Sequence, residues 1–564
     1  MKKITLLLLL VLTQIVFAQT KLTENQKLAA TCKVWGYLKY YHPQVASGKT
    51  DWDNQLFDVL PKVEKANTKD EFSLVLENWI NSLGEVKAIA PITVPKDVEY
   101  FDKNFDLSWL NNDKLFSITL SKKLKFIEDN RFQGEQHYVG FDSRDNSFVK
   151  NTNFDKLDYS DRNSRILALF TYWNVIEYFF PYKYRMDQKW DKTLEEMLPV
   201  FIEAKNDDAF YTAFQKLTVK LNDSHAVFHK YSTGNANFLP FNCKIIDEKM
   251  VVTEITADEL AKADDIKVGD VITKFNDKTI KDFVAENRNL INGSNEAAYL
   301  GNLMKFGVYG YSDNVKLDFL KDGKTITKTI NWYDYNNAHK NEFKKGIQKG
   351  KFKMLENNIG YVDMGALKIN DVPEMIEKLK SAKAIVFDIR NYPNGTYIDI
   401  ANFLNSKERN FIMFTRPDSL YPGKFIWHGP RPCGSENKNN YKGKVVVLVN
   451  EESVSHSEET AMCFQAADNC TIIGSQTAGA DGNVSNFEAI KAVFTRFSGI
   501  GVYYPDGRET QRIGIVPDIE VKPTILGIQQ GKDEVLDRAL QFIESGKETK
   551  LKTTLNIKNE TFLK

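Results

Sequence analysis

The sequence is poor in cysteine, has no net charge, and contains only one long hydrophobic run. Its five cysteines, spread over 564 residues, are too few and too scattered for a disulfide scaffold. One bridge is possible and none is required; Cys463 lies in a helical pattern and is expected to be buried. Lysine plus arginine and aspartate plus glutamate number 75 each, so nothing indicates binding to nucleic acid or to an acidic membrane surface.

Motifs of several other enzyme classes are also missing. The chain has no Gly-x-Ser-x-Gly elbow, no phosphate-binding loop and no dinucleotide-binding glycine pattern. The pair His225-x-x-x-His229 has helical spacing, but it lacks the glutamate of His-Glu-x-x-His and has no evident third ligand. We therefore expect no metal and no other cofactor.

The hydrophobic run at the N-terminus has the pattern of a signal peptide. Lysines at positions 2 and 3 precede the apolar stretch Ile4–Phe17, and Val16-Phe17-Ala18 supplies small residues for cleavage before Gln19. The run is shorter than the ~20 residues of a spanning helix, and no cysteine follows the cleavage site to carry a lipid. We expect an exported protein, periplasmic or extracellular, with no transmembrane segment once the signal peptide is removed.

The first half of the chain contains an internal duplication. Nine residue types recur at an offset of 138 positions, most of them apolar or proline. The pairs are Trp35/Trp173, Pro43/Pro181, Trp52/Trp190, Asp53/Asp191, Leu56/Leu194, Leu60/Leu198, Pro61/Pro199, Phe72/Phe210 and Leu83/Leu221. The spacing of the leucines predicts one small helical unit used twice, in which Trp35 and Trp173 are core anchors.

The two copies differ at one informative place. The second copy has Ser224 and His225 where the first has Val86 and Lys87. A pair that only one copy carries is not demanded by the packing of the unit. Ser224 and His225 are therefore candidates for chemistry.

The second half changes pattern twice. Within 238–333, the run Ile266–Asn276 resembles the strand and turn of a PDZ domain, whose exposed sheet edge accepts an extended peptide. From about Asn357, strands and helices alternate, which predicts a layered α/β core. The expected strands are Ile359–Met364, Ala384–Ile389, Phe411–Phe414, Val445–Val449 and Thr471–Ile473, and the expected helices are Val372–Ala382, Thr396–Leu404 and Ser457–Ala467.

One serine lies where such a core places nucleophiles. Ser455 is at the junction between the strand Val445–Val449 and the helix that begins near Ser457. The turn exposes the hydroxyl, and the helix N-terminus offers free N–H groups to a developing oxyanion. Serines at such a junction also cap helices, and the local pattern alone favours that simpler role.

A family resemblance changes this balance. Ser455-His456-Ser457-Glu458 resembles the Ser-x-Ser-Glu nucleophile motif of the C-terminal processing (tail-specific) serine peptidases, over roughly residues 160–545. The run Asp388–Gly395 resembles the family's oxyanion turn, with Asn394 in place of a glycine. Two later signatures, Gly474–Gly479 and Gly514–Asp518, follow in order. The resemblance implies that Ser455 is the nucleophile and that the N–H groups of Gly395 and His456 are the oxyanion donors.

The sequence departs from the lysine-using members of that family at the general base. Ala480 stands where those members have lysine, and a serine hydroxyl needs a base to become a good nucleophile. Ser224-His225 resembles the serine–histidine pair of the tricorn-like branch, in which histidine is the base. We expect Ser224 to hydrogen-bond the imidazole. That branch also uses a glutamate, whose matching position is Gln511, with Glu509 nearby, so this fourth role is open.

The sequence therefore predicts an α+β multidomain serine endopeptidase without cofactors. Its partners would be polypeptides, cleaved near apolar C-termini and captured by the PDZ-like domain, and the resemblance implies a ClpP/crotonase-like core. The predicted segments are a signal peptide (1–18), a first helical unit with a β-rich extension (19–150), a second helical unit (151–232), a PDZ-like domain (235–335), the peptidase core (341–545) and a loose tail (546–564). The alternative is an inactive family member that binds peptides or hydrophobic ligands.

Overall fold

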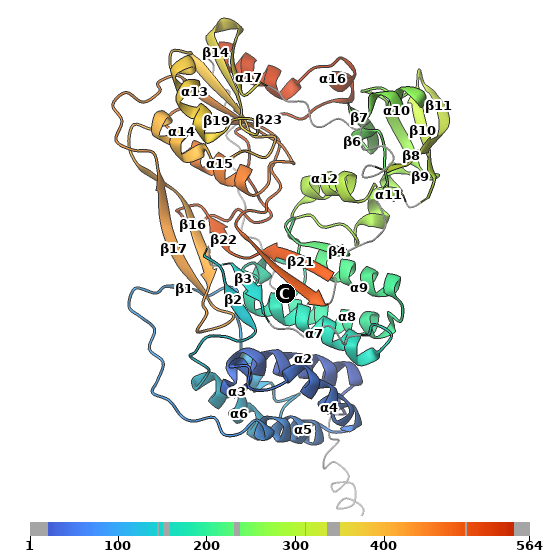
Figure 1. Ribbon diagram of the computed structural model, residues 1–564, viewed down its shortest axis with the longest axis vertical. Coiled ribbons are helices and arrows are strands. Elements are labelled where there is room, and N and C mark those ends of the chain that lie inside the picture. Colours follow the sequence, from blue (N-terminus) through green and yellow to red (C-terminus); the bar gives the residue numbers. More distant parts are fainter. Residues whose placement is uncertain are drawn as a thin grey trace, which may run out of the picture.

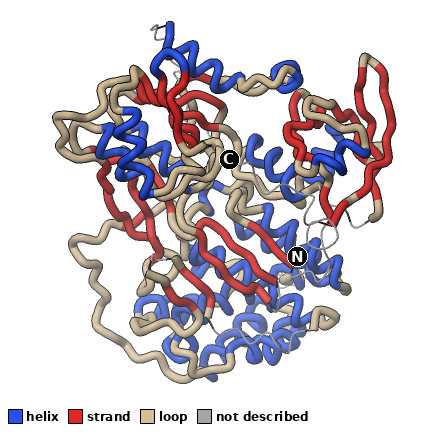
Figure 2. The backbone as a smooth tube through the Cα atoms, turned by 45° about the horizontal axis from the view of Figure 1, so that its top comes forward, coloured by secondary structure: helices blue, strands red, loops and turns tan. Residues whose placement is uncertain are grey.

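The computed structural model describes residues 21–143, 146–150, 158–230, 237–308, 310, 312–334, 350–490 and 493–545. The expected signal peptide and the expected tail lie outside this range. Figure 1 shows a helical body at the bottom of the view, an α/β domain above it, and a small β-rich domain to one side. In Figure 2, where helices are blue and strands red, helices predominate in the lower body. Within the described residues, every helix is too short or too polar to cross a bilayer.

The helical body contains two units whose helices coincide at the offset of 138. Helices α2 (Glu24–Tyr41) and α4 (Trp52–Lys65) correspond to α7 (Arg162–Phe179) and α8 (Trp190–Glu203), and α5 (Lys69–Ser82) corresponds to α9 (Asp207–Val219). One hydrogen bond is also repeated. The indole of Trp52 donates to the carbonyl of Trp35, and that of Trp190 donates to Trp173, both at 3.0 Å.

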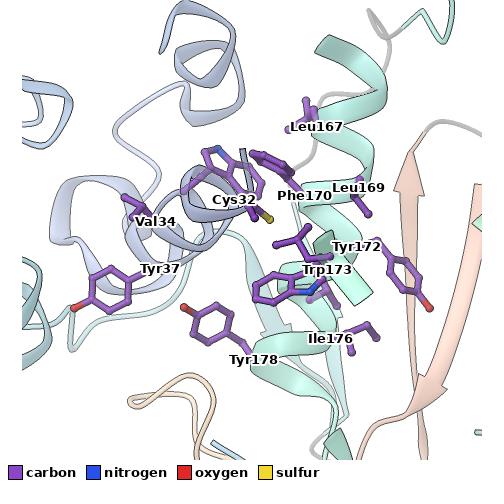
Figure 3. Packing of buried hydrophobic residues seen from close by; sticks show 14 of the residues in the cluster. Cys32, Val34, Tyr37, Leu167, Leu169, Phe170, Tyr172, Trp173, Ile176 and Tyr178 are labelled. Atoms are coloured by element: carbon purple, nitrogen blue, oxygen red, sulfur yellow. The ribbon is translucent and has the colours of Figure 1, made fainter. Parts of the chain in front are cut away.

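The two units pack through α2 and α7, where Figure 3 shows side chains of both helices meeting. Equivalent positions face each other at this contact. A Cβ atom on Gly36 would lie 1.7 Å from the side chain of Asn174, its counterpart in the second unit. Asn174 Nδ2 in turn donates to the carbonyl of Cys32 at 3.1 Å. The glycine is needed because the two helices approach closely here.

Between the units, the chain mixes short strands with helices. The elements are α3 (Pro43–Ala46), β1 (Tyr100–Phe101), η1 (Ser108–Asn111), α6 (Ile118–Asp129), β2 (Val139–Phe141), β3 (Ser147–Val149) and η3 (Lys183–Arg185). The extension of the first unit thus holds a helix of 12 residues as well as strands.

The domain at the side is built on a sheet of order β11-β10-β8-β7-β6. Its elements are β5 (Asn237–Phe238), β6 (Phe241–Ile246), β7 (Lys249–Ile255), α10 (Asp258–Ala263), β8 (Val271–Phe275), β9 (Lys278–Thr279), α11 (Ile280–Asn287), α12 (Glu296–Phe306), β10 (Asn314–Lys321), β11 (Lys324–Asn331) and β12 (Tyr333–Asp334). The predicted strand within Ile266–Asn276 is β8, preceded by a turn in which Gly269 has φ +88°.

The α/β domain has three layers around a sheet of order β13-β14-β15-β18-β19-β23, parallel except for β13. The strands are β13 (Phe352–Leu355), β14 (Ile359–Asp363), β15 (Ala384–Asp388), β18 (Lys444–Val449), β19 (Cys470–Gly474) and β23 (Ile519–Glu520). One face packs on helices α13 (Val372–Leu379), α14 (Tyr397–Leu404) and α15 (His456–Gln465), and the other on α17 (Glu534–Ser545). Short helices η4 (Glu356–Asn358), η5 (Ile369–Asp371) and α16 (Ile525–Gln529) complete it.

Two further sheets join this domain to the rest of the chain. The strand expected at Phe411–Phe414 does not belong to the parallel sheet: it lies within β16 (Arg409–Pro417), in the sheet β1-β17-β16-β22, with β17 (Phe425–Cys433) and β22 (Gly501–Tyr503). Because β1 comes from the helical body, this sheet spans both parts. The other sheet has the order β20-β21-β4 and contains β20 (Val484–Ile490), β21 (Val493–Ser498) and β4 (Val227–Lys230).

We expect each unit of the duplication to depend on its anchor tryptophan. Trp35 and Trp173 are 0% and 1% exposed, so truncation to alanine should cost about 3–5 kcal/mol of unfolding free energy in each case. Chemical denaturation of W35A and W173A measures this. The control is L74A on α5, where the leucine is 55% exposed and the change should be within about 0.5 kcal/mol. Equal midpoints for all three variants would contradict the packing described.

Candidate active site

Ser455 lies in a sharp turn between strand β18 and helix α15. It is the residue directly before the helix, and its backbone angles are φ 57° and ψ −118°, a conformation that residues with a Cβ atom rarely adopt. Such backbone strain costs of order 1–3 kcal/mol and persists only where the surroundings impose it. The turn leaves the serine partly exposed at the N-terminal end of the helix.

Glu458 is the group that imposes this turn. The carboxylate is 0% exposed and accepts hydrogen bonds from the backbone N–H groups of Ser455 (3.2 Å) and Ala480 (3.0 Å), and also from Gly479 N and Thr477 Oγ1. Burial raises the pKa of Glu458, and these four donors oppose the shift. The backbone N–H of Ser455 also donates to the carbonyl of Ala480, at 3.0 Å. The carboxylate therefore fixes the Thr477–Ala480 loop against the serine.

The predicted oxyanion turn packs beside the start of α15. Ser453 Oγ donates to the carbonyl of Ile389 (2.9 Å), and Ser457 Oγ donates to that of Asn391 (3.3 Å). Among the described residues, the N–H groups of Gly395 and His456 have no hydrogen-bond acceptor. These two N–H groups are thus available to a ligand.

Asn394, which replaces a glycine of the family turn, stabilises this turn. Its side-chain amide donates to the carbonyls of Gly365 (3.0 Å) and Leu367 (2.9 Å), in the segment that follows β14. Its φ is not positive, so the position does not require glycine.

His225 reaches the α/β domain through the three-stranded sheet. It directly precedes β4, which pairs antiparallel with β21, and Arg496 is opposite Val227. Continuing this register places His225 opposite Ser498, and the imidazole Nδ1 lies 2.9 Å from Ser498 Oγ. Figure 1 shows β4 and β21 side by side above α7 and α9. The histidine of the helical unit is therefore held by the α/β domain.

A buried carboxylate, Asp223, organises the surroundings of His225. It is 0% exposed and accepts hydrogen bonds from Ser498 Oγ (3.0 Å), Ser498 N (2.8 Å), His225 N (3.1 Å) and Gln511 Nε2 (3.3 Å). The hydroxyl hydrogen of Ser498 goes to the carboxylate, which can only accept. The Ser498 oxygen must then accept from His225, so the imidazole carries its proton on Nδ1 and leaves Nε2 as the basic nitrogen.

Burial also determines the charge of His225. It lowers the pKa of the imidazole below its ordinary value; the nearby carboxylate of Asp223 opposes this shift, and the Arg496 guanidinium adds to it. His225 is therefore neutral near pH 7, the state in which Nε2 can accept a proton.

The remaining candidates lie near this group in other roles. The hydrogen bond that we expected from Ser224 to the imidazole is not formed. Ser224 Oγ accepts from Ser294 N (2.8 Å) and Ser224 N donates to Ser294 Oγ (2.7 Å), because the chain turns this side chain toward the domain at the side. Gln511 contacts Asp223. Glu509 forms an ion pair with Arg185, at 3.1 Å.

Sequence reasoning missed Asp223 and Ser498. Comparison of the two helical units does not single out Asp223, because its counterpart is Glu85 and both copies carry a carboxylate. Its position two residues before His225 was the available signal. Ser498 has no local signal, since only the pairing of β21 with β4 brings it to the imidazole.

Ser455 and His225 both lie near the short segment from Ala480 to Val484. Ser455 N bonds to Ala480 O, and four residues later Val484 pairs with Ser498, the partner of the imidazole. Ser455 Oγ and His225 are not hydrogen-bonded to each other within the described part of the chain. The two histidines considered for a metal, His225 and His229, lie on a turn and a strand rather than a helix, and no metal-binding cluster occurs among the described residues.

Comparisons with known proteins identify two domains in the chain and solved structures of similar fold. Residues 358–521 match the family described as Peptidase family S41, and residues 235–305 match a PDZ domain. A solved structure of mature CPAF complexed with lactacystin has a TM-score of 0.56 at 13% identity, covering 69% of this chain and 100% of that one. A putative peptidase from Parabacteroides merdae ATCC 43184 has a TM-score of 0.41 at 15% identity, covering 67% and 96%. No curated protein matches. At these identities, the likeness to CPAF is one of fold.

The protonation of His225 can be measured without any assay of activity. We expect its imidazole to titrate below the ordinary value of about 6.5, because burial disfavours the charged form. NMR of protein with 13C-labelled histidine gives the titration, and H225Q identifies the signal. D223N should lower the pKa further, since it removes the negative charge that favours the imidazolium. A pKa above 6.5 in the native protein would contradict the burial described.

Proposed function

We propose that this chain is a serine peptidase with Ser455 as its nucleophile and His225 as the general base, because residues 358–521 match Peptidase family S41. The observation that carries the proposal is the strained backbone of Ser455 at the N-terminus of α15. A serine that only capped the helix would have no reason to adopt it. Nucleophiles at strand-to-helix turns show the same kind of strain.

In the proposed reaction, the neutral imidazole removes the proton of Ser455 as the hydroxyl attacks a peptide carbonyl. The N–H groups of Gly395 and His456 stabilise the oxyanion, and His225 then returns the proton to the leaving amine. A water molecule hydrolyses the acyl-enzyme by the same steps. The reaction requires Nε2 of His225 to come within hydrogen-bond distance of Ser455 Oγ, a contact that often tightens only when substrate binds.

Asp223 acts on this base through Ser498. The chain of hydrogen bonds from Nδ1 through the Ser498 hydroxyl to the carboxylate fixes the tautomer, and it stabilises the positive charge that the imidazole acquires. In this mechanism Asp223 and Ser498 are positioning residues. A lysine is not needed at position 480 in this mechanism, because the base comes from the helical unit. The backbone of Ala480 instead bonds to Glu458 and Ser455.

The PDZ domain supports polypeptides as substrates, since such domains add an extended peptide to an exposed sheet edge. It also contacts the segment that carries the base. Besides the reciprocal bonds between Ser224 and Ser294, Arg512 Nε donates to the carbonyl of Ser294 at 3.1 Å. We propose substrates with apolar C-termini. The N-terminal pattern of residues 1–18 supports export to the periplasm or beyond.

Removal of either member of the proposed pair should abolish turnover. S455A and H225A should each lose nearly all cleavage of an unstructured peptide with an apolar C-terminus, and the double variant should be little worse because the two residues act together. S224A should retain a reduced rate, since its hydroxyl binds Ser294 rather than the imidazole. The control is S419A, at an exposed serine.

Two outcomes would contradict the assignment. If H225A keeps a near-native rate while S455A is inactive, another residue is the base. If the native protein itself cleaves nothing yet binds the peptide, the chain is a binding protein built on a peptidase fold.

The relay through Ser498 makes a separate prediction. S498A should lower kcat by about 10²-fold with little change in KM, because it disconnects the imidazole from the carboxylate. D223N interrupts the same relay, so the double variant should be close to the worse single one. D223N should also shift the acid limb of the kcat/KM profile to lower pH. Additive losses in the double variant would show that the two residues act independently.

A further inference from the structure

Two of the five cysteines lie against each other in the α/β domain. Cys433 is the last residue of β17, and Cys463 lies on α15, two turns after Ser455. Both belong to the core on the face of the parallel sheet that α13–α15 cover, with exposed fractions of 3% and 0%. The sulfur of Cys433 is 3.7 Å from the carbonyl oxygen of Cys463.

The two thiols also interact with one another, and a cation lies beside them. Hydrogen bonding to Cys463 and the guanidinium of Arg409 hold the pKa of Cys433 below its ordinary value, against the effect of burial. Arg409 is directly opposite Cys433 in the pairing of β16 with β17. Burial raises the pKa of Cys463, and so does the neighbouring thiol. Cys433 is therefore the more reactive member, because thiolates are the nucleophiles of disulfide exchange.

The end of β17 that carries Cys433 is weakly paired, so its thiol can become accessible. β1 pairs with β17 only at Phe425 and Ile426, so the segment that ends at Cys433 pairs on one side alone. Its pairing with β16 is interrupted by two register shifts. Opening this end of the strand breaks few hydrogen bonds and exposes the sulfur.

We propose that Cys433 and Cys463 form a disulfide that attaches the end of β17 to the helix carrying Ser455. The oxidant is a disulfide compound, such as oxidised glutathione or a disulfide-donating oxidoreductase. The Cys433 thiolate attacks one of its sulfurs, which breaks the oxidant's S–S bond and releases one thiolate. That thiolate takes the proton of Cys463, whose sulfur then attacks Cys433 and expels the second thiolate. The protein loses two protons and two electrons, and the oxidant becomes two thiols.

The bond would strengthen a contact that polar groups already make. Arg431, two residues before Cys433, forms an ion pair at 3.3 Å with Glu459, which lies one turn before Cys463 on α15. A disulfide closes a loop of about 30 residues and restricts the unfolded chain accordingly. The oxidised protein should hold α15 in place at temperatures at which the reduced protein releases it.

Mass spectrometry tests the proposal directly. The native chain is incubated with oxidised or reduced glutathione, free thiols are blocked with N-ethylmaleimide, and the protein is digested without reduction. We expect the oxidised sample to contain a cross-linked peptide joining Cys433 to Cys463, lighter by two hydrogens than the two peptides together. The control C243A, in the PDZ domain, should leave this cross-link unchanged. Alkylation of both thiols in the oxidised sample, or a link from Cys463 to Cys470, overturns the proposal.

Thermal unfolding gives a second measurement that does not depend on activity. The oxidised protein should melt roughly 5–10 °C higher than the reduced one, and C433A should abolish the difference. If C433A does not fold, the comparison of oxidised with reduced native protein still decides the question. An unchanged Tm in protein shown to carry the cross-link would mean that the bond does not restrain α15, and would overturn the proposed attachment.

Discussion

The buried carboxylate of Asp223 is the group on which the candidate site depends. It collects donors from three separate parts of the chain: the turn that carries His225, the end of β21 at Ser498, and the loop at Gln511. A buried carboxylate without such donors would be costly, so the three parts must come together for the chain to fold. The group that would support the chemistry thus also fixes how the helical body meets the α/β domain.

A second carboxylate, Glu458, holds the proposed nucleophile Ser455 in place, as Asp223 holds the proposed base His225. It holds the Thr477–Ala480 loop against the strained turn of Ser455 by four hydrogen bonds. Both carboxylates are fully buried and accept hydrogen bonds from backbone, hydroxyl and amide donors rather than from cations. The positions of Ser455 and His225 are therefore set by the interior of the protein.

The apolar periodicity of the sequence predicted most of the individual helices and strands. The helices of both units, the strands β14, β15, β18 and β19, and the helices α13–α15 lie where apolar periodicity places them. The sheet membership of Phe411–Phe414 could not be predicted, because apolar strands look alike whichever partner they pair with. The hydrogen bond expected from Ser224 to the imidazole was wrong because its actual partner, Ser294, is 70 residues away, and a local sequence pattern does not show such a distant contact.

Because the residues of the candidate site are spread along the chain, the site can form only late in synthesis. Its parts run from Asp223 to Gln511, and β4 finds its partner strand only after Ser498 has been made. During synthesis, the helical units and the PDZ domain emerge first, and the imidazole of His225 then still lacks its partner Ser498. Under the proposed mechanism, the growing polypeptide cannot cleave itself or its neighbours until synthesis has passed Gln511.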